Sequence, residues 1–143
     1  MKQLILFVIC LIIAQTSAFA ENIPFSEYIN KPYIGMSYNK ALHSTRPFLL
    51  IFASNNNVNL IPQLLPIAQF VYNNYYHYYN FSILNVEKEN NAHLANLYKV
   101  KTLPTAFIVD PKSKTFIKIN PKHYNIKDLD YILNNYLIKK HYK

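Results

Sequence analysis

Apolar residues gather in a few short runs along this chain of 143 residues, and polar or proline-containing segments separate them. Residues 48–53 and 105–109 are nearly continuous apolar runs, which is typical of strands that are buried on both faces. Residues 81–86 form a third candidate strand. Residues 115–119 alternate between polar and apolar side chains, which predicts a half-exposed strand. The pattern therefore predicts four strands.

Four other segments repeat their apolar residues at helical spacing: residues 37–45, 60–71, 91–97 and 126–137. Ser37 and Asn91 are suitable residues to cap the first and third of these helices. Pro62 and Pro66 must lie in a first turn or at a kink of the second. The order is then helix, strand, helix, strand, helix, strand, strand, helix. It predicts an α/β fold in which a βαβ unit precedes a β-hairpin and a last helix, with helices on both faces.

The first twenty residues have the pattern of a signal peptide. Lys2 provides a positive charge, residues 4–14 are largely apolar, and Ala18-Phe19-Ala20 resembles a cleavage site. The alternative is a retained membrane anchor, but the apolar stretch is shorter than the roughly 20 residues that span a bilayer. We therefore expect an exported protein, periplasmic or secreted, that begins at Glu21 and meets a membrane only during export.

The rest of the chain is long enough for one domain. Pro24 and Pro32 interrupt residues 21–36, which predicts an irregular segment. Residues 37–138 contain all the predicted helices and strands. Residues 139–143, which begin with Lys139 and Lys140, are expected to form a basic tail.

Charge and cysteine content narrow the classes of function. The formal net charge is +8, or +7 without Lys2, yet the lysines are spread along the chain. This distribution favours a solvated surface with nonspecific affinity for anions over a specific nucleic-acid site. The single cysteine is Cys10, within the predicted signal peptide. An exported form without it has neither a disulfide nor a thiol.

Residues 97–111 contain a Tyr-x-Val sequence, then Leu103-Pro104-Thr105 at the start of an apolar strand. Together with residues 46–53 and 83–86, this segment resembles the thioredoxin-like family. The resemblance implies a thioredoxin-like fold with a central mixed four-stranded sheet flanked by helices. It also implies a cis-proline loop at Pro104.

The chain departs from the redox-active members of that family. Their Cys-x-x-Cys motif would fall near Asn56 and Asn59, and residues 54–61 contain no cysteine. Their buried acid and lysine correspond to about Leu50 and Ile83, both apolar. We therefore expect no disulfide chemistry, no catalytic residue and no cofactor. A degenerate member of a thiol-disulfide oxidoreductase system, which uses the thiols of a partner, is an alternative.

The resemblance implies a peptide-binding groove beside the proline loop, with an extended peptide or a protein as partner. The residues expected to line it are Ser54, Asn55, Asn56, Asn57, Asn59, Leu103, Pro104 and Thr105. Another hypothesis is a basic protein that binds the cell envelope. The five histidines have no metal-ligand spacing, so no metal site is expected. Tyrosines 72, 75, 76 and 79 share a helical face, either as a binding surface or as a cover of the core.

Overall fold

The computed structural model describes residues 33–54 and 60–141. They form a mixed α/β fold with a five-stranded sheet in the order β1-β3-β2-β4-β5. The elements are β1 (Tyr33–Gly35), α3 (Tyr38–Leu42), β2 (Phe48–Ala53), α4 (Leu60–Tyr75), β3 (Asn80–Asn85), α5 (Glu89–Leu97), β4 (Thr105–Asp110), β5 (Thr115–Lys118), the 3₁₀-helix η1 (Pro121–His123) and α6 (Ile126–His141).

The four predicted strands are present, and their burial explains why the sequence revealed them. Every residue of β2, β3 and β4 is buried, in agreement with their apolar runs. β2 and β3 are parallel and joined through α4, whereas β4 is antiparallel to both β2 and β5. The predicted βαβ unit, hairpin and final helix are therefore confirmed.

The sheet has one strand more than the sequence predicts. Tyr33–Gly35 pair with β3 in antiparallel orientation, although residues 21–36 are predicted to be irregular. A strand of three residues is too short to show a periodic pattern, so its pairing depends on the neighbouring strand. Gly35 ends this strand with a φ of +83°, a conformation that favours glycine. The prediction of four strands is therefore wrong, and so is that of an irregular segment at residues 33–35, whereas residues 21–32 lie outside the described residues.

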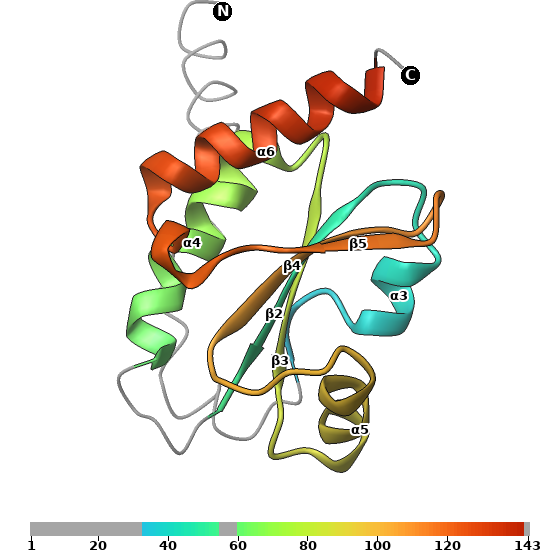
Figure 1. Ribbon diagram of the computed structural model, residues 1–143, viewed down its shortest axis with the longest axis vertical. Coiled ribbons are helices and arrows are strands. Elements are labelled where there is room, and N and C mark those ends of the chain that lie inside the picture. Colours follow the sequence, from blue (N-terminus) through green and yellow to red (C-terminus); the bar gives the residue numbers. More distant parts are fainter. Residues whose placement is uncertain (1–32, 55–59, 142–143) are drawn as a thin grey trace, which may run out of the picture.

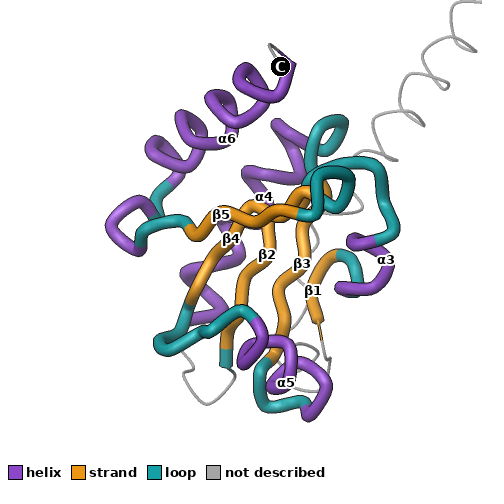
Figure 2. The backbone as a smooth tube through the Cα atoms, turned by 45° about the vertical axis from the view of Figure 1, so that its right-hand side comes forward, coloured by secondary structure: helices purple, strands orange, loops and turns teal. Residues whose placement is uncertain are grey.

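Helices cover both faces of the sheet, as Figure 1 shows for α4 and α6 on one side and for α3 and α5 on the other. The larger core contains Leu64 and Val71 of α4 together with Leu129 and Leu133 of α6. The smaller core lies on the opposite face, where the aromatic side chains of β2 and β4 pack against Ala41 of α3 and against α5. Figure 2 shows β5 at one edge of the sheet and β1 at the other.

Local contacts define how the helices begin and end. The Ser37 side chain caps α3, as predicted, and accepts a hydrogen bond from the Lys40 amide. α5 begins at Glu89 instead of after Asn91, so the prediction that Asn91 is its cap is wrong. α6 extends to His141, so Lys139 and Lys140 belong to this helix and not to a tail. None of the helices in the described residues is long and apolar enough to cross a membrane.

Candidate functional site

The candidate site lies at the end of the sheet where the parallel strands β2 and β3 finish. Thr105, the first residue of β4, pairs with Phe52 near the end of β2. The loop before β4 therefore reaches the same end of the sheet as Ser54, which follows β2. In open α/β sheets, ligands bind preferentially beyond the carboxyl ends of the parallel strands.

Polar contacts join the ends of β2 and β3 at this site. The buried Ser54 hydroxyl donates a hydrogen bond to Oε1 of Glu87, and the Val86 amide donates to the Ala53 carbonyl over 2.9 Å. The contact therefore links the residue after β2 to the turn after β3. Ser54 and Glu87 thereby form a polar wall at this end of the sheet.

Two asparagines shape the turn after β3. Oδ1 of Asn85 accepts a hydrogen bond from the Glu87 amide at 3.1 Å, and Nδ2 of Asn91 donates to the Asn85 carbonyl at 2.9 Å. Nδ2 of Asn85 is buried and has no hydrogen-bond partner among the described residues. Sequence reasoning did not include Asn85, Glu87 or Asn91 in the site. Their position directly after a predicted strand was the available indication.

The proline loop supplies the other side of the site. The Leu103–Pro104 peptide bond is cis. The Thr105 side chain is fully buried, and its hydroxyl donates to the Thr102 carbonyl. Leu103 is 37% exposed, and none of the hydrogen bonds of the described residues uses its backbone N–H or C=O. This exposed residue therefore offers one donor and one acceptor of the main chain to a binding partner.

The structure brings four of the predicted groove residues to the same end of the sheet: Ser54, Leu103, Pro104 and Thr105. Thr105 is fully buried and pairs with Phe52 of β2, so it offers no exposed surface to a ligand. Asn55, Asn56, Asn57 and Asn59, as well as the predicted signal peptide, lie outside the described residues.

Cysteines and clusters of metal-ligating side chains are both absent from the described part of the chain. These residues include no cysteine. Leu50 and Ile83 are both buried, but they belong to the cores on opposite faces of the sheet. No group of three metal-ligating side chains occurs among the described residues.

The tyrosines at the end of α4 serve mainly as packing residues. Tyr75 and Tyr79 are buried, whereas Tyr76 and Tyr78 are about half exposed. The Tyr79 hydroxyl donates to the Leu133 carbonyl at 2.9 Å. Burial and, to a smaller extent, the nearby Tyr136 raise the pKa of Tyr79 far above its ordinary value. The hydroxyl therefore stays protonated and remains a donor. The core-covering interpretation holds for Tyr75 and Tyr79.

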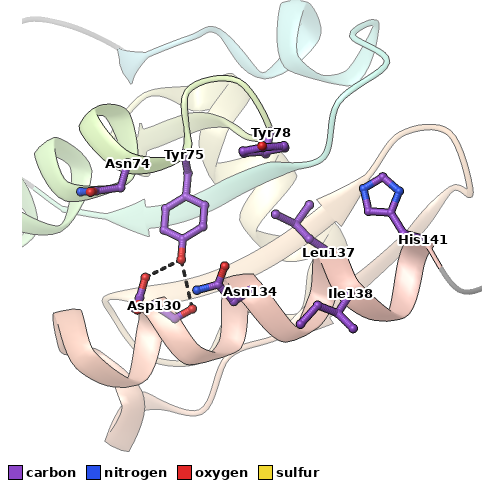
Figure 3. Close-up of a pocket in the computed structure, with 8 residues that line it drawn as sticks. All are labelled: Asn74, Tyr75, Tyr78, Asp130, Asn134, Leu137, Ile138 and His141. Atoms are coloured by element: carbon purple, nitrogen blue, oxygen red, sulfur yellow. Dashed lines mark hydrogen bonds between the residues drawn. The ribbon is translucent and has the colours of Figure 1, made fainter.

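A cavity of about 620 Å³ lies between the end of α4 and α6, away from the proline loop (Figure 3). At its centre the Tyr75 hydroxyl points toward Asp130 and donates to the carboxylate and the carbonyl of that residue. Burial and this hydrogen bond to Asp130 raise the pKa of Tyr75. The contact fixes α6 against α4. The lining residues are Asn74, Tyr75, Tyr78, Asp130, Asn134, Leu137, Ile138 and His141.

The structure is a mixed α/β fold in which the exposed Leu103, whose backbone N–H and C=O make no hydrogen bond among the described residues, lies at the same end of the sheet as the polar ends of β2 and β3. A scan against models of protein families and a search of curated proteins both found no match.

Proposed function

We propose that this chain is an exported, thioredoxin-like protein without redox cysteines, which binds an extended peptide or protein segment beside the proline loop. The topology supports the family assignment: a parallel βαβ unit precedes an antiparallel hairpin and a last helix. The segment from Leu103 to Thr105 stands at the start of β4, as in the family that the sequence resembles.

The observation that carries the proposal is the free backbone of Leu103. An extended peptide that lies along the loop can donate a hydrogen bond to the Leu103 carbonyl and accept one from the Leu103 amide, as when a strand is added to a sheet. Ser54 and Glu87 form a polar wall at the same end of the sheet. Main-chain pairing of this kind needs neither a thiol nor a metal.

A photo-crosslinking experiment tests this site. The photoreactive amino acid benzoylphenylalanine replaces Leu103 in one variant and Leu97 in a matched control, because Leu97 is an exposed leucine of α5. Twelve-residue peptides selected on the protein from a random phage library serve as probes. The expected result is crosslinking at position 103 that exceeds that at position 97 at least ten-fold and that unlabelled peptide suppresses.

N-methylation of the peptide backbone tests whether the main chain is what binds. Methylating the central amides of a selected peptide should weaken its binding at least ten-fold. Equal crosslinking at the two positions, or no loss on N-methylation, would refute backbone pairing at Leu103.

Export is tested separately by mass spectrometry of the protein from its native host. The expected first residue is Glu21, after cleavage that follows Ala20. Recovery of the chain with Met1 in the membrane fraction would contradict export and would indicate a retained anchor.

A further inference from the structure

β5 is a short and exposed strand at the edge of the sheet. It pairs with β4 on one side, and in the described residues no strand pairs with its other side (Figure 2). All four residues are exposed, and Phe116 and Ile117 are 55% and 53% exposed. An edge strand with large apolar side chains is a template for pairing with another chain.

The direction of the free backbone groups follows from one hydrogen bond. The Ile119 amide donates to the Ala106 carbonyl over 2.9 Å, so the backbone of Ile119 faces β4. In an antiparallel ladder this direction alternates from residue to residue. The N–H and C=O groups of Ile117 therefore also face β4, whereas those of Phe116 and Lys118 face outward and can pair with an added strand.

The side chains beside these groups give the edge an apolar centre. The ring of Phe116 lies 4.9 Å from that of Tyr98 and 5.7 Å from that of Phe107, measured between ring centroids. Phe116 therefore extends an aromatic cluster that continues into the core on the side of α5. An apolar side chain of a partner strand can pack on its exposed part.

The charge at this edge is positive. Residues 111–123 contain four lysines and no acid: Lys112, Lys114, Lys118 and Lys122. The preceding acid, Asp110, is buried and paired with Lys140. Lys118 and Phe116 pair with Phe107 and Val109, so their side chains lie on the same face of the sheet. Two copies joined edge to edge would bring these lysines together, which disfavours a second copy as the occupant.

We propose that the outer edge of β5 binds an extended segment of a partner protein in which an acidic residue lies two positions from an apolar residue. The acidic side chain pairs with Lys118, the apolar one packs against Phe116, and the outward backbone groups of both residues complete a sixth strand. This proposal does not depend on the proposed function, because β4 separates β5 from β2 and the edge uses different backbone groups.

Fluorescence anisotropy with defined peptides tests the charge requirement. The probe is a fluorescein-labelled nine-residue peptide in which glutamate and phenylalanine alternate at every second position, with threonine between them, so that each glutamate lies two positions from a phenylalanine on the same face of the strand. The matched control contains lysine in place of each glutamate. The acidic peptide should bind at least ten-fold more tightly than the basic one at 50 mM salt, and this advantage should shrink at 500 mM salt.

Variants at position 118 test where the peptide binds. Lys118→Glu should weaken binding of the acidic peptide at least ten-fold. Lys127→Glu, which changes an exposed lysine of α6, should change the affinity less than two-fold. Lys118→Pro removes the outward N–H and should bind at least three-fold more weakly than Lys118→Ala. If Lys118→Pro does not fold, the original protein is tested with an N-methylated form of the acidic peptide, which should also bind at least three-fold more weakly than the unmethylated peptide.

Several results would overturn the proposal. They are equal binding of the two peptides, no effect of Lys118→Glu, and no binding of the acidic peptide at 1 mM. Concentration-dependent dimerisation in analytical ultracentrifugation that Phe116→Ser abolishes would show that a second copy occupies the edge instead.

Discussion

Asp110 is a buried carboxylate that connects the β4–β5 turn to the last helix, and its substitution gives a clear test of the structure. The side chain is 4% exposed. Oδ2 accepts a hydrogen bond from the Tyr136 hydroxyl at 3.0 Å and lies 2.8 Å from Nζ of Lys140. Oδ1 accepts from the Lys112 amide at 3.0 Å. One acid therefore holds α6 and shapes the turn.

The cost of replacing Asp110 follows from these contacts. Hydrogen bonds to a charged group contribute about 1.5–3 kcal/mol each, and breaking a buried ion pair costs about 3–5 kcal/mol. The Lys140 side chain is 32% exposed and can regain water, which lowers the cost. We expect Asp110→Ala to reduce the free energy of unfolding by about 2–4 kcal/mol. Asp110→Asn keeps the acceptor for the turn and should cost about 1–2 kcal/mol.

The contribution of Asp110 should depend on pH. Burial alone would raise its pKa, but the hydrogen bonds from Lys140 and Tyr136 and the charge of Lys140 hold that pKa below its ordinary value. Burial and the bond to Asp110 raise the pKa of Tyr136 to about 12, so its hydroxyl remains a donor at neutral pH. Because the pKa of Asp110 is lower in the folded state, its stabilisation is complete above about pH 5 and is lost as the pH falls through the folded pKa.

Urea unfolding followed by circular dichroism measures this effect. The difference between the original protein and Asp110→Asn should be constant from pH 6 to 8 and should shrink below about pH 4. Glu89→Gln, which changes an exposed acid in the first turn of α5, is the control and should alter stability by less than about 0.5 kcal/mol. Equal stability of Asp110→Asn and the original protein, or a difference that stays constant as the pH falls below about 4, would refute the reasoning.

Three further predictions concern packing and chemistry. Tyr79→Phe removes the hydrogen bond to the Leu133 carbonyl and should lower the free energy of unfolding by about 1–2 kcal/mol in urea. Gly35→Ala should cost more than about 1 kcal/mol, because the new Cβ would lie 2.4 Å from the Phe81 ring at a φ of +83°. A chain that begins after Cys10 has no thiol and should not reduce insulin above the blank in a turbidity assay.

Each of these predictions has its own control. Tyr76→Phe removes a hydroxyl from a half-exposed ring and should leave stability nearly unchanged, so equal losses at Tyr76 and Tyr79 would contradict the role of the buried bond. An unchanged unfolding midpoint for Gly35→Ala would show that β1 does not pack against Phe81 as described. Insulin reduction above the blank would contradict the expectation that this chain carries out no disulfide chemistry.

The sequence alone determined the strands of the sheet interior and most of the helices. β2 begins and ends at the predicted residues, and the predicted starts of β4 and β5 are also correct. The interior strands could be recognised because burial on both faces selects continuous runs of apolar residues. The helices could be recognised because burial of one face selects apolar residues three or four positions apart. Pro104 and its neighbours could likewise be located, because proline restricts the local backbone.

Tertiary structure alone decided which residues meet across the fold. The strand Tyr33–Gly35 exists because β3 offers it hydrogen bonds, and the turn that contains Asn85 and Glu87 lies beside Ser54 because β2 and β3 are parallel. Asp110 and Lys140 are 30 positions apart in the sequence, yet the buried carboxylate of Asp110 forms an ion pair with the partly exposed Lys140. Such contacts depend on how distant segments pack, and no local pattern of apolar and polar residues records that packing.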